Sequence, residues 1–333
     1  MRRITELSDD IRIFSYSAVG GYEERRGPLG EKFDFCDDSN KFGQKTWEKA
    51  EAEMSRISLN IALSKANLSH TDLDICVGGD LQNQCVASCL GLSSFGIPYL
   101  GVYGACSTCT ESIMILSSFM NSNKDIKFGA AITSSHNSAA ERQFRTPIEY
   151  GGQRSPTAQW TSTAAGSFIL GREGRVSVKE YMPGRIVDGA TTDSSNMGAA
   201  MSFAAADTIL SYFAETSYPI SYFDYIVTGD LGRVGSSLLC DILKEERAGL
   251  EKFHTDCGLL LYDFDKKDAH SGASGCGTSA SVLSSYFLPR LESGELKRIL
   301  FLSTGALMNP SSILQGEDIY GIAPLIMLES NIN

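Results

Sequence analysis

Cys106 is the residue of this sequence that is best placed for covalent chemistry. It lies in Gly104–Thr108, between a short apolar run that is typical of a buried strand and a segment with helical spacing. The unpaired N–H groups and the dipole at a helix start favour a thiolate, and a thiolate is the nucleophile of cysteine-dependent acyl transfer. Free cysteines are also often simply buried. The position of Cys106 alone leaves both interpretations open.

A second group of polar residues follows the apolar run at 128–135. His136 and Asn137 come directly after it, and Arg142, Arg145 and Arg154 follow within a short segment. Guanidinium groups bind carboxylates with two parallel hydrogen bonds, so these arginines are candidates for binding a carboxylate. The alternatives are a buried histidine with an internal partner and arginines paired with neighbouring glutamates at the surface. The sequence does not separate these alternatives.

The elements that would position these residues occur twice along the chain. Asp230 lies 150 residues after Asp80 in a similar strand-and-turn segment, and Cys276 lies 170 residues after Cys106 in a similar glycine-rich turn. The expected elements of the first half are a helix at 47–68, strands at 72–81, 99–103 and 128–135, and a helix at 110–120. Those of the second half are helices at 196–214 and 279–288 and strands at 224–231 and 298–304.

Strands that alternate with helices indicate an α/β fold with mostly parallel sheets. We expect two halves, residues 1–175 and 176–333, related by a pseudo-twofold axis. The carboxyl ends of the strands in both halves would then face one central crevice, which is where open α/β folds bind ligands. Cys106, Asp230 and Cys276 are expected at that crevice, and Arg233 could enter it from the second half.

The order of these motifs resembles the stage V sporulation protein AD family, within the thiolase-like fold of thiolases and ketoacyl synthases. The resemblance covers nearly the whole chain. The segments that carry it are Gly104–Thr108, Thr133–Asn137, Ala140–Arg145, Glu149–Gln153, Thr228–Leu231, Asp256–Leu259 and Thr304–Leu307. It implies a layered α-β-α-β-α arrangement of two duplicated halves, and a homodimer formed through the strand at 99–103.

The resemblance also implies a function. Members of this family are similar to a dipicolinate-binding subunit of the system that moves dipicolinic acid into the developing spore and releases it at germination. The implied partners are dipicolinate and integral membrane subunits of that system. No cofactor is implied, and it is left open whether calcium accompanies the ligand. The expected ligand-binding residues are Cys106, Ser107, His136, Asn137, Arg142, Arg145, Asp230, Arg233 and Cys276.

Departures from the acyl-transfer pattern favour binding over catalysis. Ketoacyl synthases carry a histidine where this chain has Asp230, and their asparagine falls near Cys276. The second thiolase cysteine is missing from Ser303–Ala306, and His270 resembles a thiolase motif that is here one residue short. A nucleophile needs a base and oxyanion donors, so we expect a non-catalytic protein. The alternative is a cysteine-dependent acyltransferase with Cys106 as its nucleophile.

Composition limits the other classes of function. The formal net charge is −11, which is a poor match for the phosphates of nucleic acid. No apolar run is long enough for a membrane helix, and the first residues show no secretory signal. The nine cysteines are an odd number in a long chain, which is typical of free thiols in a reducing compartment. No metal site is expected. We expect a cytoplasmic protein, or one bound peripherally to the forespore or spore inner membrane.

Overall fold

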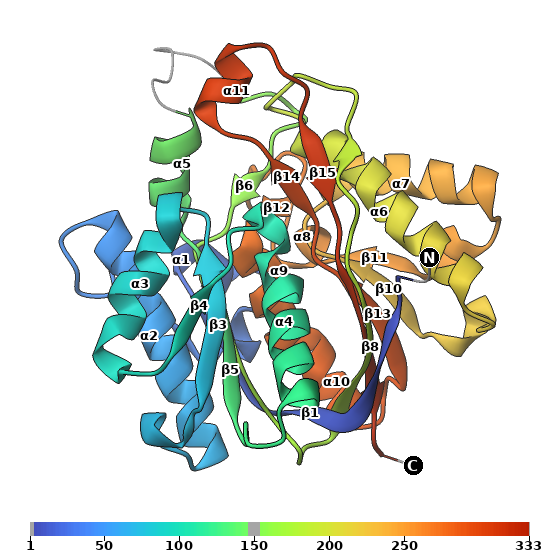
Figure 1. Ribbon diagram of the computed structural model, residues 1–333. Helices are drawn as coiled ribbons and strands as arrows, with labels where there is room; N and C mark the ends of the chain where they lie inside the picture. Colours follow the sequence, from blue (N-terminus) through green and yellow to red (C-terminus); the bar gives the residue numbers. More distant parts are fainter. Residues whose placement is uncertain (1–2, 146–153, 333) are drawn as a thin grey trace.

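The computed structural model describes residues 3–145 and 154–332, and it contains an 11-stranded sheet built from two similar halves (Figure 1). The strand order of the first half is β4-β3-β5-β7-β1, and that of the second half is β11-β10-β13-β16-β8. The bounds are β1 Thr5–Gly20, β3 Ile75–Asp80, β4 Tyr99–Gly101, β5 Gly129–Ser135, β7 Ala164–Gly171, β8 Val176–Met182, β10 Tyr225–Thr228, β11 His254–Asp256, β13 Arg298–Leu302 and β16 Leu325–Ser330. The short β2, Phe35–Cys36, pairs with β1.

The two halves also share the same pattern of strand directions. In the first half β4, β3, β5 and β1 run one way, and β7 runs against them. In the second half β11, β10, β13 and β8 run one way, and β16 runs against them. The predicted α/β class, with two duplicated and mostly parallel halves, is therefore confirmed. The boundary expected after residue 175 falls between β7 and β8.

Helices lie on both outer faces of the sheets and between them, which gives five layers (Figure 1). Helices α2 (Trp47–Ala66) and α3 (Val86–Leu92) cover the first half, and α6 (Met197–Glu215) and α7 (Gly232–Glu246) cover the second. Helices α4 (Thr108–Ser122) and α9 (Cys276–Val282) form the middle layer. Strand β13 is buried on both faces by these layers. Phe301 packs in the central core, whereas Leu300 and Leu302 pack with α6 and α7 on the other face.

Two helices have bounds that differ from the predicted ones. The helix expected over 47–68 ends at Ala66, because Asn67 adopts a left-handed conformation with φ of 55° and caps the helix. The helix expected over 279–288 begins earlier, at Cys276, and passes through a π-helical turn at Leu283–Phe287 into α10 (Leu288–Glu292). Across the described ranges, no helix combines the length and the apolar character that crossing a membrane requires.

Smaller elements gather at one end of the sheet. The pair β6 (Trp160–Thr161) and β12 (Ala273–Ser274) is parallel, and β14 (Gly305–Leu307), β15 (Tyr320–Ile322) and β9 (Val187–Asp188) form a three-stranded antiparallel sheet. The short helices are α1 (Tyr22–Arg26), α5 (Asn137–Arg145), α8 (Cys257–Leu260) and α11 (Pro310–Leu314). Figure 1 shows α5, α11, β6, β12 and β14 together above the carboxyl ends of the central strands. Residues of α5, β6, β12 and β14 line the site described below.

Strand β4 generates a prediction about assembly. Within the described residues it pairs only with β3, and Leu100 and the nearby Tyr103 are exposed. Because an unpaired edge strand is a template for pairing with another chain, we expect a homodimer through β4. Sedimentation equilibrium at micromolar concentration should give twice the chain mass of 36.0 kDa.

Two substitutions separate this interface from a general effect of surface charge. Leu100→Lys should shift the protein toward the monomer, because it places a charge on the edge strand. Phe35→Lys changes an equally exposed apolar residue beside β1 and should leave the dimer intact. A wild-type protein that sediments only as a monomer would contradict the prediction.

Candidate functional site

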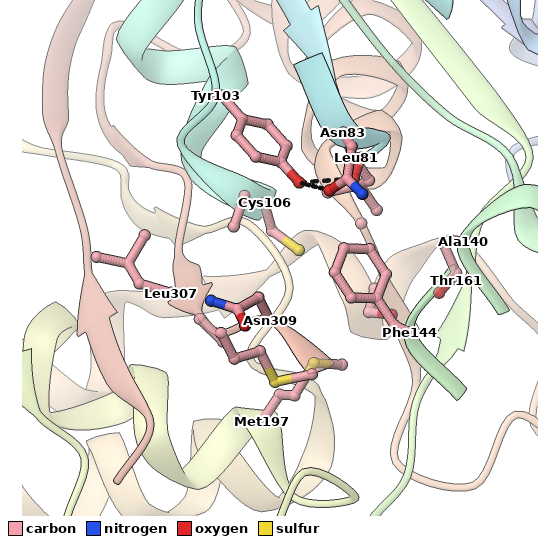
Figure 2. Close-up of a pocket in the computed structure, with 15 residues that line it drawn as sticks. Leu81, Asn83, Tyr103, Cys106, Ala140, Phe144, Thr161, Met197, Leu307 and Asn309 are labelled. Carbon is pink, nitrogen blue, oxygen red and sulfur yellow. Dashed lines mark hydrogen bonds between the residues drawn. The ribbon is translucent and has the colours of Figure 1, made fainter. Parts of the chain in front are cut away.

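A cavity of about 470 Å³ lies where strand ends of both halves meet (Figure 2). Its walls come from the turn after β4, from α5, from β6 and β12, and from the start of α6 and the segment after β14. Figure 2 shows the Cys106 thiol directed into the space between these walls. The lining residues are Leu81, Asn83, Tyr103, Ala105, Cys106, Ala140, Phe144, Thr161, Met197, Ser274, Gly275, Ala306, Leu307, Met308 and Asn309.

Two tight turns form the floor of the cavity. Ala105 has a φ of 52°, a left-handed conformation that is uncommon for a residue with a side chain, and it precedes Cys106 in a short 3-10 turn that leads into α4. In the second half, Gly275 has a φ of 98°, and an added Cβ there would lie 2.8 Å from the Ser135 hydroxyl. Glycine is therefore required where β12 turns into α9.

Asp230 joins the two halves directly behind the floor. Its Oδ1 accepts a hydrogen bond of 2.8 Å from the Thr304 hydroxyl, and its Oδ2 accepts one of 2.8 Å from the Gly275 N–H. The Cys106 side chain is a further hydrogen-bonding partner. Asp230 is 1% exposed, and this burial raises its pKa to about 7, against the effect of the hydrogen bonds. The predicted meeting of Cys106 and Asp230 at one crevice is present, with Cys106 on the cavity surface and Asp230 behind it.

Cys276 and Ser107 lie beside Cys106 but do not line the cavity. The Cys276 thiol donates a 3.0 Å hydrogen bond to the Ser134 carbonyl at the end of β5, and its side chain packs in a small cluster with Cys106. The Ser107 hydroxyl is 2.6 Å from the Gly104 carbonyl and 2.8 Å from Glu111 Oε1. Both residues thus have internal partners that stabilise the floor. Their contact with a ligand stays a prediction.

His136 and Asn137 occupy a neighbouring region. His136 is buried, its Nε2 lies 2.8 Å from the Asn40 carbonyl, and its ring packs at a tilt against Trp47 with centroids 5.3 Å apart. Burial lowers the pKa of His136, which keeps the ring neutral. Asn137 Nδ2 donates a 3.0 Å hydrogen bond to the carbonyl of Thr161, a wall residue. Asn137 therefore supports the wall from behind.

The arginines expected at the ligand have other partners. Arg142 forms an ion pair with Glu48 of α2, and the Arg233 guanidinium lies 3.8 Å from the ring centroid of Phe264. Arg154 donates to the Gln159 carbonyl. The side chain of Arg145, like the motif at 149–153, lies outside the described residues. None of the described arginines lines the cavity, and their role as ligand contacts stays a prediction.

Most of the cavity walls were not among the predicted site residues. The larger apolar contacts come from Leu81, Tyr103, Phe144, Leu307 and Met308. In a sequence such residues have the same appearance as core residues, because both are apolar and both follow the period of their element. Only the glycine-rich turns beside these residues could be recognised in the sequence as part of a site.

A pair of buried carboxyl groups lies near the end of β3 and was also not predicted. Glu51 of α2 accepts hydrogen bonds from Gln82 Nε2 at 2.6 Å and from the Ser134 hydroxyl at 3.0 Å. Asp80 accepts from the backbone N–H and the hydroxyl of Ser88, at 2.7 and 2.6 Å. Burial, together with the nearby Asp80, raises the pKa of Glu51 to about 8. This pair is therefore at least partly protonated at neutral pH.

Comparison with known proteins identifies the family. The family model described as "Stage V sporulation protein AD (SpoVAD)" matches residues 1–329. The stage V sporulation protein AD of Bacillus subtilis (strain 168) is 40% identical over 320 residues, which cover 96% of this chain and 94% of that protein. The chain belongs to the stage V sporulation protein AD family. The family resemblance found in the sequence is therefore confirmed, and with it a place among sporulation proteins.

Solved structures confirm the thiolase-like fold of this SpoVAD family member. The 3-oxoacyl-[acyl-carrier-protein] synthase III of Aquifex aeolicus VF5 matches with a TM-score of 0.58 at 13% identity, covering 96% of this chain and 99% of that chain. The cerulenin-bound OleA of Xanthomonas campestris matches with a TM-score of 0.57 at 12% identity, covering 96% and 97%. A tetronic acid condensing enzyme, AbyA1, has a TM-score of 0.58 at 13% identity, covering 96% and 100%. At these identities the likeness concerns the fold alone.

The burial of Asp230 generates a prediction about stability. Because its pKa is raised from 3.8 to about 7, the folded chain keeps a proton that the unfolded chain loses near pH 4. The stability that this proton contributes is complete below pH 4 and is lost as the pH rises toward 7. Relative to Asp230→Asn, the wild-type free energy of unfolding should fall over this range by at most about 4 kcal/mol. Urea unfolding at several pH values measures it.

Asp125→Asn provides the control, because Asp125 is an exposed carboxylate in the loop after α4. Its free energy of unfolding should follow the wild-type pH dependence. If Asp230→Asn does the same, the Asp230 carboxyl is already ionised at the acid end of the range, and the prediction is wrong.

Proposed function

We propose that this chain is a non-catalytic dipicolinate-binding subunit of the spore system that takes up and releases dipicolinic acid in sporulation and germination. The observation that carries the proposal is the cavity at the converging strand ends, in a member of the stage V sporulation protein AD family. Its volume of about 470 Å³ is in the range of small-molecule sites. The chain would act with integral membrane subunits at the forespore or spore inner membrane.

The chemistry of the walls suits an aromatic dicarboxylic acid. Apolar contacts from Leu81, Phe144 and Leu307 can cover the faces of a planar ring, while the amides of Asn83 and Asn309 can bind carboxylate oxygens. Dipicolinate has this combination of an aromatic ring and two carboxylates. The amides do not carry charge, so calcium or an arginine that reaches the cavity would add to the affinity.

The position of the histidines supports binding rather than acyl transfer. The chain has four histidines, all of them in described segments, and none lines the cavity. The His70 ring meets Phe95 edge to face, His254 Nε2 is 2.8 Å from the Thr228 hydroxyl, and His270 Nδ1 is 3.2 Å from Asp268 Oδ1. His136 is held by Asn40. No imidazole is therefore placed to take the proton of Cys106, as a thiol nucleophile requires.

Calorimetry with dipicolinate, with and without calcium, tests the proposal. Phe144→Ala should weaken binding about 10-fold or more, because a buried aromatic contact is lost. Phe35→Ala removes an exposed phenylalanine from the far strand β2 and should change nothing. Arg142→Ala and Arg233→Ala report whether these arginines leave their present partners to meet the ligand.

Two outcomes would count against the proposal. A wild-type protein that binds no dipicolinate under either condition does not have this function. Wild-type affinity in both Phe144→Ala and Cys106→Ala would place the ligand outside this cavity.

The second candidate is a cysteine-dependent acyltransferase. The specific observation in its favour is the Cys106 thiol on the surface of a mostly apolar cavity, where an acyl chain could lie. We expect no stable adduct after incubation with acyl-CoA, as measured by intact mass. An adduct that appears on the wild type and disappears in Cys106→Ala, but not in the Cys89→Ala control at an exposed thiol, would favour the enzyme.

A further inference from the structure

A hydroxyl group without a partner lies at the floor of the cavity. Ser274, the last residue of β12, is 1% exposed and lines the cavity beside Gly275. Within the described part of the chain its Oγ has no hydrogen-bonding partner. Buried hydroxyl groups are normally satisfied, so an orphaned one indicates a missing partner.

Several polar groups around Ser274 have partners within the protein. The Ser274 carbonyl accepts hydrogen bonds from the Ser162 N–H at 2.9 Å and from the Thr278 hydroxyl at 2.7 Å. The Ser135 hydroxyl donates to the Ser162 carbonyl at 2.8 Å. The fold thus holds the backbone of Ser274 by other contacts and does not use its side chain.

The cavity has both polar and apolar groups on its walls. Ser274 is buried, whereas the amides of Asn83 and Asn309 belong to exposed residues. Phe144 and Leu307 lie on opposite sides of the cavity (Figure 2). The Gly275 N–H already donates to Asp230, whereas the neighbouring Ser274 hydroxyl has no partner within the described residues.

We propose that the Ser274 hydroxyl binds one carboxyl group of an aromatic dicarboxylate and so fixes its orientation, with the ring between the apolar walls and the second carboxyl group at the amide of Asn83 or of Asn309. This inference rests on the proposed dipicolinate function and adds the residue that determines the orientation. The hydroxyl donates a hydrogen bond to a carboxylate oxygen. The Ser274 side chain therefore adds to the affinity for the ligand, although it makes no hydrogen bond within the described residues of the unliganded protein.

Calorimetry with dipicolinate tests this role. Ser274→Ala should weaken binding about 10-fold or more, because a hydrogen bond to a charged group is lost. Ser274→Thr keeps the hydroxyl and should retain most of the affinity. Ser285→Ala is the matched control, because Ser285 is also buried with an orphaned hydroxyl but lies in the π-helical turn away from the cavity. The melting temperature of unliganded Ser274→Ala should equal that of the wild type.

Each result decides between the two proposals. If the wild type binds dipicolinate and Ser274→Ala binds equally well, the Ser274 inference is wrong and the proposed function stands. If Ser274→Ala loses affinity together with thermal stability, and Ser274→Thr does not restore binding, Ser274 is structural and the inference is also wrong. If the wild type binds no dipicolinate, the proposed function and this inference both fail.

Discussion

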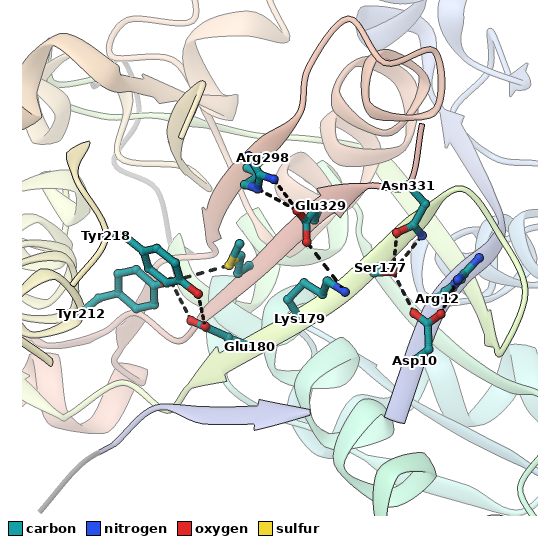
Figure 3. A network of polar contacts seen from close by, with 11 residues as sticks. Asp10, Arg12, Ser177, Lys179, Glu180, Tyr212, Tyr218, Arg298, Glu329 and Asn331 are labelled. Carbon is teal, nitrogen blue, oxygen red and sulfur yellow. Dashed lines mark hydrogen bonds and ion pairs between the residues drawn. The ribbon is translucent and has the colours of Figure 1, made fainter. Parts of the chain in front are cut away.

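The pairing of β1 with β8 is the constraint on which the rest of the structure depends. Strand β1 is 16 residues long, and it pairs with β7 through Arg12–Gly20 and with β8 through Thr5–Ile13. One strand thus belongs to both half-sheets and sets their relative orientation. Figure 3 shows polar contacts beside this junction, where the Ser177 hydroxyl of β8 is 3.0 Å from Asp10 of β1 and 3.1 Å from Asn331.

This orientation brings the strand ends of both halves to one place. Cys106 follows β4 in the first half, and Asp230 follows β10 in the second, yet they share a hydrogen bond. The Cys276 thiol similarly reaches the end of β5. The hydrogen bonds of these polar groups compensate for their burial. The hydroxyl of Ser274, a residue of the cavity, has no partner within the described part of the chain and is therefore informative.

The same fold occurs in a 3-oxoacyl-[acyl-carrier-protein] synthase III and in a tetronic acid condensing enzyme. A buried carboxyl, Asp230, lies beside Cys106, and the histidines have partners elsewhere. The walls are mostly apolar and include amide and hydroxyl groups. Such a cavity can select a ligand by shape and hydrogen bonding.

The sequence by itself determined the features that depend on local patterns and on their repetition. Hydrophobic periodicity located strands β3, β4, β5, β10 and β13 and helices α2, α4, α6 and α9, but not β1, β7, β8, β16 or α7. The offsets between Cys106 and Cys276 and between Asp80 and Asp230 predicted two matching halves. Because the carboxyl ends of parallel strands lie at one edge, the meeting of Cys106 and Asp230 followed from this duplication.

Only the tertiary structure decided which side chains line the cavity. His136 has its partner, Asn40, 96 residues away, and Arg142 pairs with Glu48 of α2. No local pattern encodes such distant contacts, since they depend on how α2 packs across β5. Phe144 and Leu307 could not be separated from core residues for the same reason: burial in a core and exposure to a cavity require the same apolar side chains, and only packing distinguishes them.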